Sequence, residues 1–269
     1  MLDKLSSVIL ECDVVLVFAG AGMSADSNLP TYRDTEGFWN DYPLYRDLKK
    51  DYISMMSPQG FHSDPHFTWG FFAHQYMLYA KAVPHDGYKK LLDLCRSLED
   101  FFIVTTNVDG LFLKTGFPQS KLHEAHGTIH RMQCGIPCSQ EVWDSKDLEI
   151  EIDYQTMRAK DPLPSCPVCA AVSRPNIFMY GDSTESYIYT PAEISAKQFR
   201  AFREKYKNSR VLILDIGVGA EGMKTHITAY KQLFTDAIHC CINPQAPDTT
   251  DHNFYIAKGA KDTLLEVSL

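Results

Sequence analysis

Buried strands and amphipathic helices alternate along most of this chain. Residues 14–21 (VVLVFAGA) form a continuous apolar run that ends in a glycine-containing turn, a pattern typical of a parallel strand covered on both faces. Similar runs begin at Phe101 (FFIVTTNVD) and Ser209 (SRVLILDIGVGA), and each follows a helical pattern, at 87–100 and 195–207. This alternation predicts an α/β fold with a Rossmann-like, doubly wound parallel sheet.

Further elements are predicted at both ends of the chain. Residues 5–12 are typical of a short helix, residues 237–244 (AIHCCINP) and 253–259 (NFYIAKG) of strands, and residues 260–269 of a closing helix.

Two internal segments lack the alternation of helix and strand. Residues 36–85 are aromatic-rich and mostly helical in pattern, and residues 128–180 hold four of the eight cysteines. We therefore predict a smaller inserted domain, a helical module plus a zinc module, with a ligand crevice between the domains at the carboxyl ends of the strands. The predicted boundaries are 1–35, 86–127 and 181–269 for the Rossmann-like domain, and 36–85 and 128–180 for the small domain.

Composition narrows the class of ligand. The 269 residues are 45% hydrophobic and 22% charged, as in an ordinary globular protein, and the net charge is −8. A negative chain disfavours nucleic acid and anionic membranes as partners, so we expect a small molecule or a protein as ligand. The longest apolar run is too short to cross a bilayer and the start of the chain lacks a signal-peptide core, which predicts an intracellular, cytoplasmic protein.

Four cysteines have the spacing of a metal site. Cys134 and Cys138 (CGIPC) and Cys166 and Cys169 (CPVC) form two close pairs separated by 27 residues. Two such pairs suit one tetrahedral zinc ion, and a closed site of four sulfurs leaves no position for a substrate. The zinc is therefore predicted to be structural, and the other four cysteines fall in helix or strand patterns typical of the core.

The stretch LHEAHGTIHRMQC (122–134) invites a comparison with the helical zinc-protease motif, in which two histidines four apart include a glutamate directly after the first. The match fails because Gly127 stands four positions after His123, and a glycine also weakens a helix there. The turn GAGMS (20–24) after the first strand suits a pyrophosphate, but alone it is a weak signal because no glycine follows Gly22 three residues later.

Taken together, several stretches make the chain resemble the sirtuins, the NAD-dependent protein deacylases. The resemblance rests, in the family's order, on GAGMSADSNLPTYRDTEGFW (20–39), TTNVDGLFLKTG (105–116), EAHG (124–127), the two cysteine pairs, RPNIFMYGD (174–182) and, more loosely, GVGA (217–220) and INP (242–244). It implies NAD as cofactor, one structural zinc ion, and an acylated protein or peptide as substrate.

The resemblance also implies a role for each matching residue. Asn107 and Asp109 would hold the nicotinamide ribose and carboxamide, and His126 would be the catalytic base. A neutral imidazole with a pKa near about 6.5 suits the deprotonation of a ribose hydroxyl at neutral pH. The implied cofactor-binding residues are Gly20, Ala21, Gly22, Ala25, Tyr32, Arg33, Thr106, Asn107, Asp109, Gly217, Gly219 and Asn243, and the implied substrate-binding residues are Phe72, Gln75, Tyr180 and Gly181. His123 and His130 are interpreted as ordinary loop residues.

Departures from the family pattern bear on specificity. Thr31 replaces the usual Asp, as in members that prefer acidic acyl groups. Those members read the acyl carboxylate with a Tyr and an Arg, where an ungapped alignment puts Phe72 and Gln75. Because the guanidinium is missing, a succinyl specialist is disfavoured.

Other departures keep two alternatives open. Thr106 replaces the family's Gln, and TTNVD resembles a divergent branch that transfers ADP-ribose to protein, while GVGAEGMKTH lacks the valine-rich strand that pairs with a substrate peptide. The main prediction is an NAD-dependent lysine deacylase that releases nicotinamide and O-acyl-ADP-ribose. The alternatives are an ADP-ribosyltransferase or NAD hydrolase on the same fold, and a module that only binds NAD or ADP-ribose.

Overall fold

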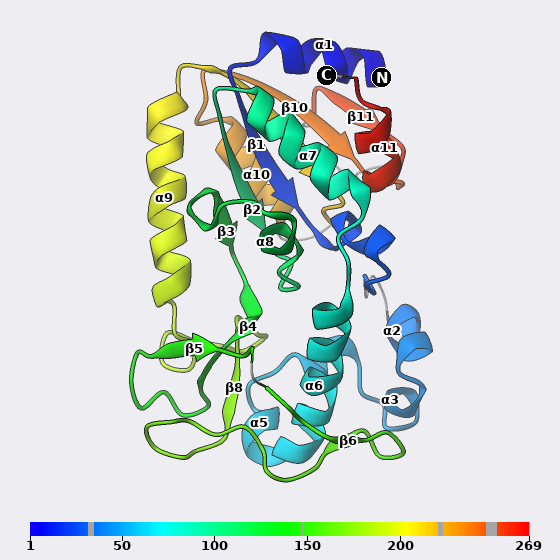
Figure 1. The fold of residues 1–269 in the computed structure, drawn as a ribbon, viewed down its shortest axis with the longest axis vertical. Helices are drawn as coiled ribbons and strands as arrows, with labels where there is room; N and C mark the ends of the chain where they lie inside the picture. Colours follow the sequence, from blue (N-terminus) through cyan, green and yellow to red (C-terminus); the bar gives the residue numbers. More distant parts are fainter. Residues whose placement is uncertain (32–34, 147, 220–222, 246–251, 269) are drawn as a thin grey trace.

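A six-stranded parallel sheet forms the centre of the computed structural model, which describes residues 1–31, 35–146, 148–219, 223–245 and 252–268. In sheet order the strands are β11 (Phe254–Ile256), β10 (Asp236–Ile242), β9 (Arg210–Ile216), β1 (Val14–Ala19), β2 (Asp100–Thr105) and β3 (Leu122–Glu124) (Figure 1). When these six strands are numbered 1 to 6 along the chain and read from β3 to β11, their order is 3-2-1-4-5-6, as in dinucleotide-binding folds. Ligands of such folds bind where the order reverses. Here the reversal lies between β1 and β9.

Helices cover both faces of this sheet. One face packs against α1 (Leu2–Glu11), α7 (Asp86–Ser97) and α11 (Ala260–Glu266), and the other against α9 (Thr190–Tyr206) and α10 (Met223–Lys231). Alternate residues of β1 explain the two layers, since Val15 and Val17 join the first core cluster and Leu16 and Phe18 the second. The Rossmann-like fold class predicted from the sequence is confirmed.

The helical segment after β1 is built on aromatic packing. It contains α2 (Thr35–Asp41), α3 (Pro43–Asp47), α4 (Tyr52–Met55), α5 (Gly60–Ser63) and the long α6 (Pro65–Lys81). Trp69, Phe71 and Phe72 of α6 are fully buried, and rings of the other helices pack around them at centroid distances of 5.2–6.0 Å. Within the described residues, no helix is both long and apolar enough to span a membrane.

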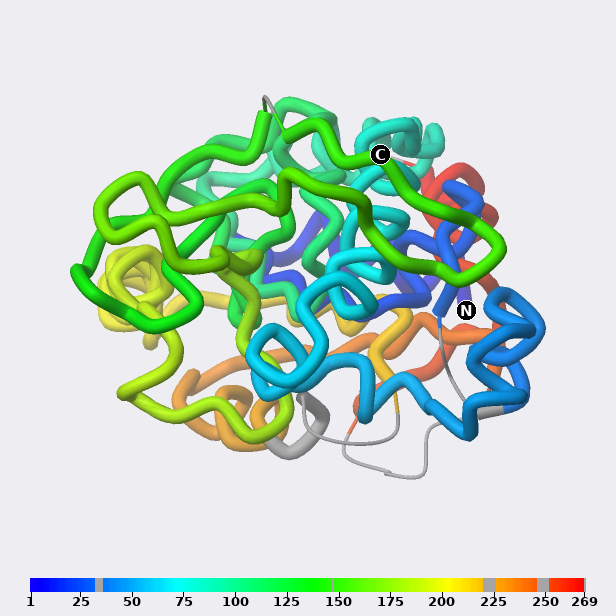
Figure 2. The backbone as a smooth tube through the Cα atoms, turned by 90° about the horizontal axis from the view of Figure 1, so that it is seen from below, coloured from blue at the N-terminus to red at the C-terminus, as the bar shows by residue number. Residues whose placement is uncertain are grey.

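A second group of strands lies beside these helices (Figure 2). β4 (Gly127–Cys134) pairs antiparallel with β5 (Val142–Asp144) and β8 (Ser173–Ile177), and β6 (Ile152–Asp153) pairs with β7 (Arg158–Ala159). These strands contact α6 at two places. The Trp69 indole donates to the Ser173 carbonyl at 2.9 Å, and the Arg158 guanidinium donates two hydrogen bonds to the carboxylate of Asp64, the N-cap of α6. The division into two domains at the boundaries given above stays a prediction.

The four cysteines of the predicted zinc site meet at one end of this second group. All four Sγ atoms lie within 4.8 Å of one another, with 3.6 Å between Cys134 and Cys169 and 3.7 Å between Cys138 and Cys166. Four sulfurs bound tetrahedrally at ~2.3 Å from a zinc ion are separated by ~3.8 Å, so the cluster fits that ion. The site joins the end of β4 to the chain leading into β8, and a metal there would hold the two strands in register.

Two turns make backbone contact where β1 and β9 end. The Gly22 amide donates to the Gly217 carbonyl at 3.0 Å, and Gly217 has φ +61°, a conformation that favours glycine. A Cβ atom on Gly22 would lie 2.7 Å from the Gly217 Cα, and a Cβ on Gly217 would lie 2.4 Å from the Gly22 carbonyl carbon. The glycines are therefore required for the approach of one turn to the other, independently of any ligand.

Replacing one zinc ligand should release the metal and loosen the β4–β8 pair. We expect one zinc ion per chain in the purified protein and less than a tenth of that in Cys166→Ser, measured by atomic emission, with a lower midpoint of thermal unfolding. Cys12→Ser is the matched control, because burial raises the pKa of Cys12 to about 11 and its thiol stays protonated. Full zinc occupancy in Cys166→Ser would contradict the assignment.

The contact between the two turns predicts a difference between neighbouring glycines. Gly217→Ala should lower the free energy of unfolding by about 2 kcal/mol or more, because its Cβ overlaps backbone and its φ is unfavourable for alanine. Gly219→Ala is the control, since no described atom lies within 4 Å of its Cβ position. Urea unfolding measures both variants, and equal losses would show that the contact does not constrain the fold.

Candidate active site

The candidate site begins at the carboxyl ends of β1 and β2. The Thr105 hydroxyl donates to the Ala19 carbonyl at 2.9 Å and accepts from the Asn107 amide at 3.0 Å, and the Thr106 amide donates to the same carbonyl at 3.2 Å. These bonds fold the chain after β2 over the end of β1. Asn107 and Asp109 are thereby brought next to the glycine turn at 20–24.

Asn107 contacts the glycine turn with one end of its side chain. Its Nδ2 donates to the Gly20 carbonyl at 2.9 Å and to the Ser24 hydroxyl at 3.1 Å. Among the described residues, no donor reaches its Oδ1. The orientation of the amide is therefore fixed from one side, and its oxygen is available to accept a hydrogen bond from a ligand hydroxyl.

Asp109 is connected to Asn107 through the Ser24 hydroxyl and is 6% exposed. Its Oδ2 accepts from the Ser24 hydroxyl at 2.6 Å, and its Oδ1 accepts from the Leu111 amide at 2.9 Å. Burial raises the pKa of Asp109, and the bond from Ser24 opposes that shift. Because both oxygens already accept hydrogen bonds, Asp109 is built into the wall of the site.

His126 lies in the turn between β3 and β4, at the junction of the two groups of strands. The Ala125 amide donates to Thr105 O at 2.8 Å and the Ile129 amide to Val108 O at 3.1 Å, so the turn is bonded to the 105–109 segment on both sides of His126. Its side chain is solvent-exposed, and no protein partner is found for the imidazole in the described part of the chain. Although the side chain is exposed to solvent, desolvation by nearby protein atoms lowers the pKa of His126, which favours the neutral base.

The two neighbouring histidines are not loop residues, contrary to the sequence interpretation. His123 lies in β3 and its Nδ1 is 2.8 Å from the Ser195 hydroxyl of α9. His130 lies in β4, where its Nε2 donates to the Asp109 carbonyl at 2.9 Å. Short strands that pair only with distant segments produce no clear periodicity, which explains the error. His130 thus helps to hold the segment that carries Asp109.

Glu124 is a second buried acid near His126. It ends β3, is 5% exposed, and its Oε2 has no hydrogen-bond partner among the described residues. The Arg131 guanidinium lies 4.0 Å away, too far for a hydrogen bond. Burial raises the pKa of Glu124 to about 7, despite the attraction of Arg131. Sequence reasoning gave this glutamate no role.

The remaining residues predicted to bind the cofactor lie around the same strand ends. Gly20, Ala21, Gly22 and Ala25 form η1 (Ala21–Met23) and η2 (Ala25–Ser27) with their caps. Asn243 follows β10, and its Nδ2 donates to the Val218 carbonyl at 3.0 Å, so it supports the turn that contains Gly217 and Gly219. Tyr32 and Arg33 lie outside the described residues.

The residues predicted to bind the substrate fall into two separate groups. Phe72 and Gln75 are buried on α6, where the Phe72 ring packs 5.2 Å from Phe61. Tyr180 and Gly181 follow β8, the Tyr180 side chain is 55% exposed, and its amide donates to the Met56 carbonyl at 2.9 Å. A further pair that sequence reasoning missed is Ser24 and Tyr88; only the position of Ser24 directly after the glycine turn signalled it.

Comparison with known proteins agrees with this geometry. A profile described as the Sir2 family matches residues 20–202. A relative from Aquifex aeolicus named NAD-dependent protein deacylase is 28% identical over 192 residues, which cover 71% of this chain and 69% of that protein. A Thermus thermophilus protein of the same name is 30% identical over 199 residues, covering 72% of this chain and 66% of the relative.

Solved structures share the fold at lower identity. A Sir2 homologue in complex with NAD has a TM-score of 0.77 at 22% identity, over 98% of this chain and 91% of that one. A Sir2 homologue bound to 2′-O-acetyl-ADP-ribose has a TM-score of 0.73 at 21% identity, over 98% and 94%. Because the family profile spans about two thirds of the sequence and these folds match over nearly all of it, the chain belongs to the Sir2 family, as its motifs predicted.

Proposed function

We propose that the chain is an NAD-dependent protein lysine deacylase. The observation that carries this proposal is the imidazole of His126, which is exposed, biased toward the neutral form and without a hydrogen-bond partner among the described residues. It lies on a turn hydrogen-bonded to the segment of Asn107 and Asp109. The names of the relatives support the same activity. A cytoplasmic location, where NAD is available and thiols stay reduced, is part of the proposal.

The proposed reaction assigns separate tasks to the residues of the site. Bound NAD would supply the acceptor: nicotinamide would leave, the acyl group of an acylated lysine would pass to ADP-ribose, and one water molecule would be consumed as the free lysine amine is released. Oδ1 of Asn107, which no donor among the described residues reaches, would accept from a hydroxyl of the nicotinamide ribose, and His126 Nε2 or Nδ1 would take a proton from a ribose hydroxyl. The buried carboxylate of Asp109 fixes Ser24, which in turn fixes the Asn107 amide.

The same proposal includes the substrate side. An acylated protein or peptide would lie along the exposed residues after β8, with Tyr180 and Gly181 in contact, and its acyl chain would point toward Phe72 and Gln75. Neither of these buried side chains carries a positive charge, so we propose that neutral acyl groups are preferred over succinyl.

Replacing the base should separate catalysis from cofactor binding. His126→Ala is expected to lower NAD-dependent deacylation at least a hundredfold, because general-base catalysis by a histidine contributes roughly that much or more, while NAD binding changes little. A panel of peptides with short, long and succinyl acyl chains, read by mass spectrometry, measures the activity. His62→Ala, an exposed histidine on α5, is the control and should be as active as the wild type.

Labelled NAD distinguishes the alternative functions in the same experiment. Deacylation gives nicotinamide and labelled O-acyl-ADP-ribose. Label on the protein, or free labelled ADP-ribose without deacylated peptide across the whole panel, would replace the proposal with the transferase or hydrolase suggested by Thr106.

The buried acid beside the base predicts how stability depends on pH. Burial raises the pKa of Glu124 in the folded protein to about 7, above its ordinary value of 4.5. The contribution of Glu124 to the free energy of unfolding is therefore fully present below pH 4.5 and is lost as the pH rises through 7. Glu124→Gln stays neutral, so its unfolding free energy relative to the wild type should rise over this window, by up to about 3 kcal/mol. Denaturant unfolding at several pH values measures it, and a difference independent of pH would contradict the assigned ionisation.

A further inference from the structure

A tyrosine on α7 contacts a residue of the candidate site from the buried side. Tyr88 is fully buried, and its hydroxyl lies 2.9 Å from the Ser24 hydroxyl, 64 positions earlier in the chain. Ser24 is the residue that contacts both Asn107 and Asp109. Tyr88 therefore belongs to the same hydrogen-bond network, although neither its sequence neighbours nor the motifs pointed to it.

The direction of each bond follows from counting hydrogens on Ser24. A serine hydroxyl has one hydrogen and two acceptor positions. The carboxylate of Asp109 can only accept, so the Ser24 hydrogen goes to it, over 2.6 Å, while the Asn107 Nδ2 can only donate. The remaining position of Ser24 must accept from the Tyr88 hydroxyl. The hydroxyl of Ser24 is thereby saturated and held in one rotamer.

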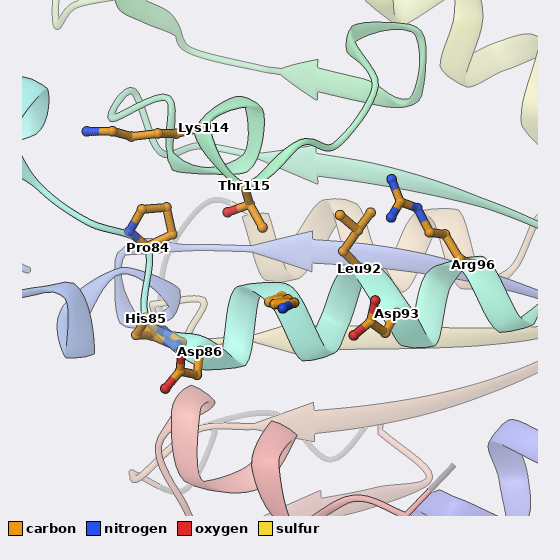
Figure 3. Close-up of a pocket in the computed structure, with 9 residues that line it drawn as sticks. Pro84, His85, Asp86, Leu92, Asp93, Arg96, Lys114 and Thr115 are labelled. Atoms are coloured by element: carbon orange, nitrogen blue, oxygen red, sulfur yellow. The ribbon is translucent and has the colours of Figure 1, made fainter.

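The start of α7 fixes the Tyr88 ring in place. The His85 amide donates to the Ser27 hydroxyl at 3.0 Å, and the His85 Nδ1 accepts from the Gly87 amide at 3.1 Å, which leaves Nε2 to donate to the Met23 carbonyl at 2.9 Å. Figure 3 shows His85 at the first turn of this helix, with Thr115 of α8 (Leu111–Thr115) across a groove. The residues 23–27 are thus attached to α7 at three points, one of which is Tyr88.

We propose that Tyr88 is a positioning residue for NAD, whose hydroxyl acts through Ser24 on the Asn107 amide and the Asp109 carboxylate. The inference rests on the proposed function, because that proposal places the nicotinamide ribose at Asn107. Donation by Tyr88 strengthens the Ser24 hydrogen bond to Asp109, since hydrogen bonds in a chain polarise one another. Without it, the Ser24 hydroxyl loses one of the bonds that fix its rotamer, and the Asn107 oxygen is less well oriented toward the ribose.

A double-mutant cycle on NAD affinity tests the relay. Tyr88→Phe removes only the hydroxyl and should weaken NAD binding roughly tenfold by titration calorimetry, the loss typical of one buried hydrogen bond. In a Ser24→Ala background the same substitution should change the affinity less than about twofold, because the relay is already broken. Ser24→Gly, which also removes the hydroxyl, replaces that background if Ser24→Ala is unfolded by circular dichroism.

The matched control is another buried tyrosine whose hydroxyl makes a side-chain hydrogen bond, in this case to an aspartate. Tyr206 is 3% exposed and donates to Asp100 at 3.1 Å, at the opposite end of β2 from the site. Tyr206→Phe should leave NAD affinity unchanged in either background, even where it lowers the thermal midpoint as much as Tyr88→Phe does.

Two results would overturn the inference: unchanged affinity in Tyr88→Phe, or an equal loss in the wild-type and Ser24→Ala backgrounds, which would reduce Tyr88 to a packing role. The titration requires no turnover. If the two substitutions have non-additive effects on NAD affinity but the protein shows no deacylation, the proposed function alone is wrong. If the protein deacylates peptides but the two effects on affinity are additive, this inference alone is wrong.

Discussion

The backbone contact between Gly22 and Gly217 fixes the geometry of the strand ends at which we propose that the ligand binds. It joins the turns after β1 and β9, the neighbouring strands at which the order of the sheet reverses. After β9 the chain enters α10 on one face, and after β1 it leaves toward the other group of helices. In folds of this type, ligands bind at the strand ends where the chain diverges in this way. Side chains larger than hydrogen at Gly22 or Gly217 would push the two turns apart.

Around that contact, each polar side chain of the site is held in place by the protein through some of its atoms, while its other polar atoms can contact a ligand. Within the part of the chain that the structure describes, Asn107 donates two hydrogen bonds through Nδ2 and no donor reaches its oxygen, and His126 is held through the backbone of its turn. Asp109 is the support for both Ser24 and the start of α8, and burial of its carboxyl gives these hydrogen bonds more weight than they would have in water. Ser24 and Asp109 thus form a rigid, fully hydrogen-bonded support beneath the polar atoms of Asn107 and His126 that can contact a ligand.

Features with a local signal could be predicted from the sequence. The apolar runs at β1, β2 and β9 are long enough to identify strands, and the cysteine pairs define a metal site by spacing alone; both agree with the structure. Contacts across long separations could not be predicted. β3 is three residues long and is a strand only because it pairs with β2, so His123 and His130 were taken for loop residues. The burial of Glu124 and the approach of Tyr88 to Ser24 likewise depend on how distant segments pack.

We propose that NAD binds where the strand order of the sheet reverses, with its nicotinamide ribose between Asn107 and His126. A crystal structure of the protein soaked with NAD or ADP-ribose tests this most directly. We expect a ribose hydroxyl within hydrogen-bond distance of Asn107 Oδ1, the His126 ring facing the same ribose, and pyrophosphate against the turn at 20–24. Cofactor density elsewhere, or a ribose that contacts neither side chain, would contradict it.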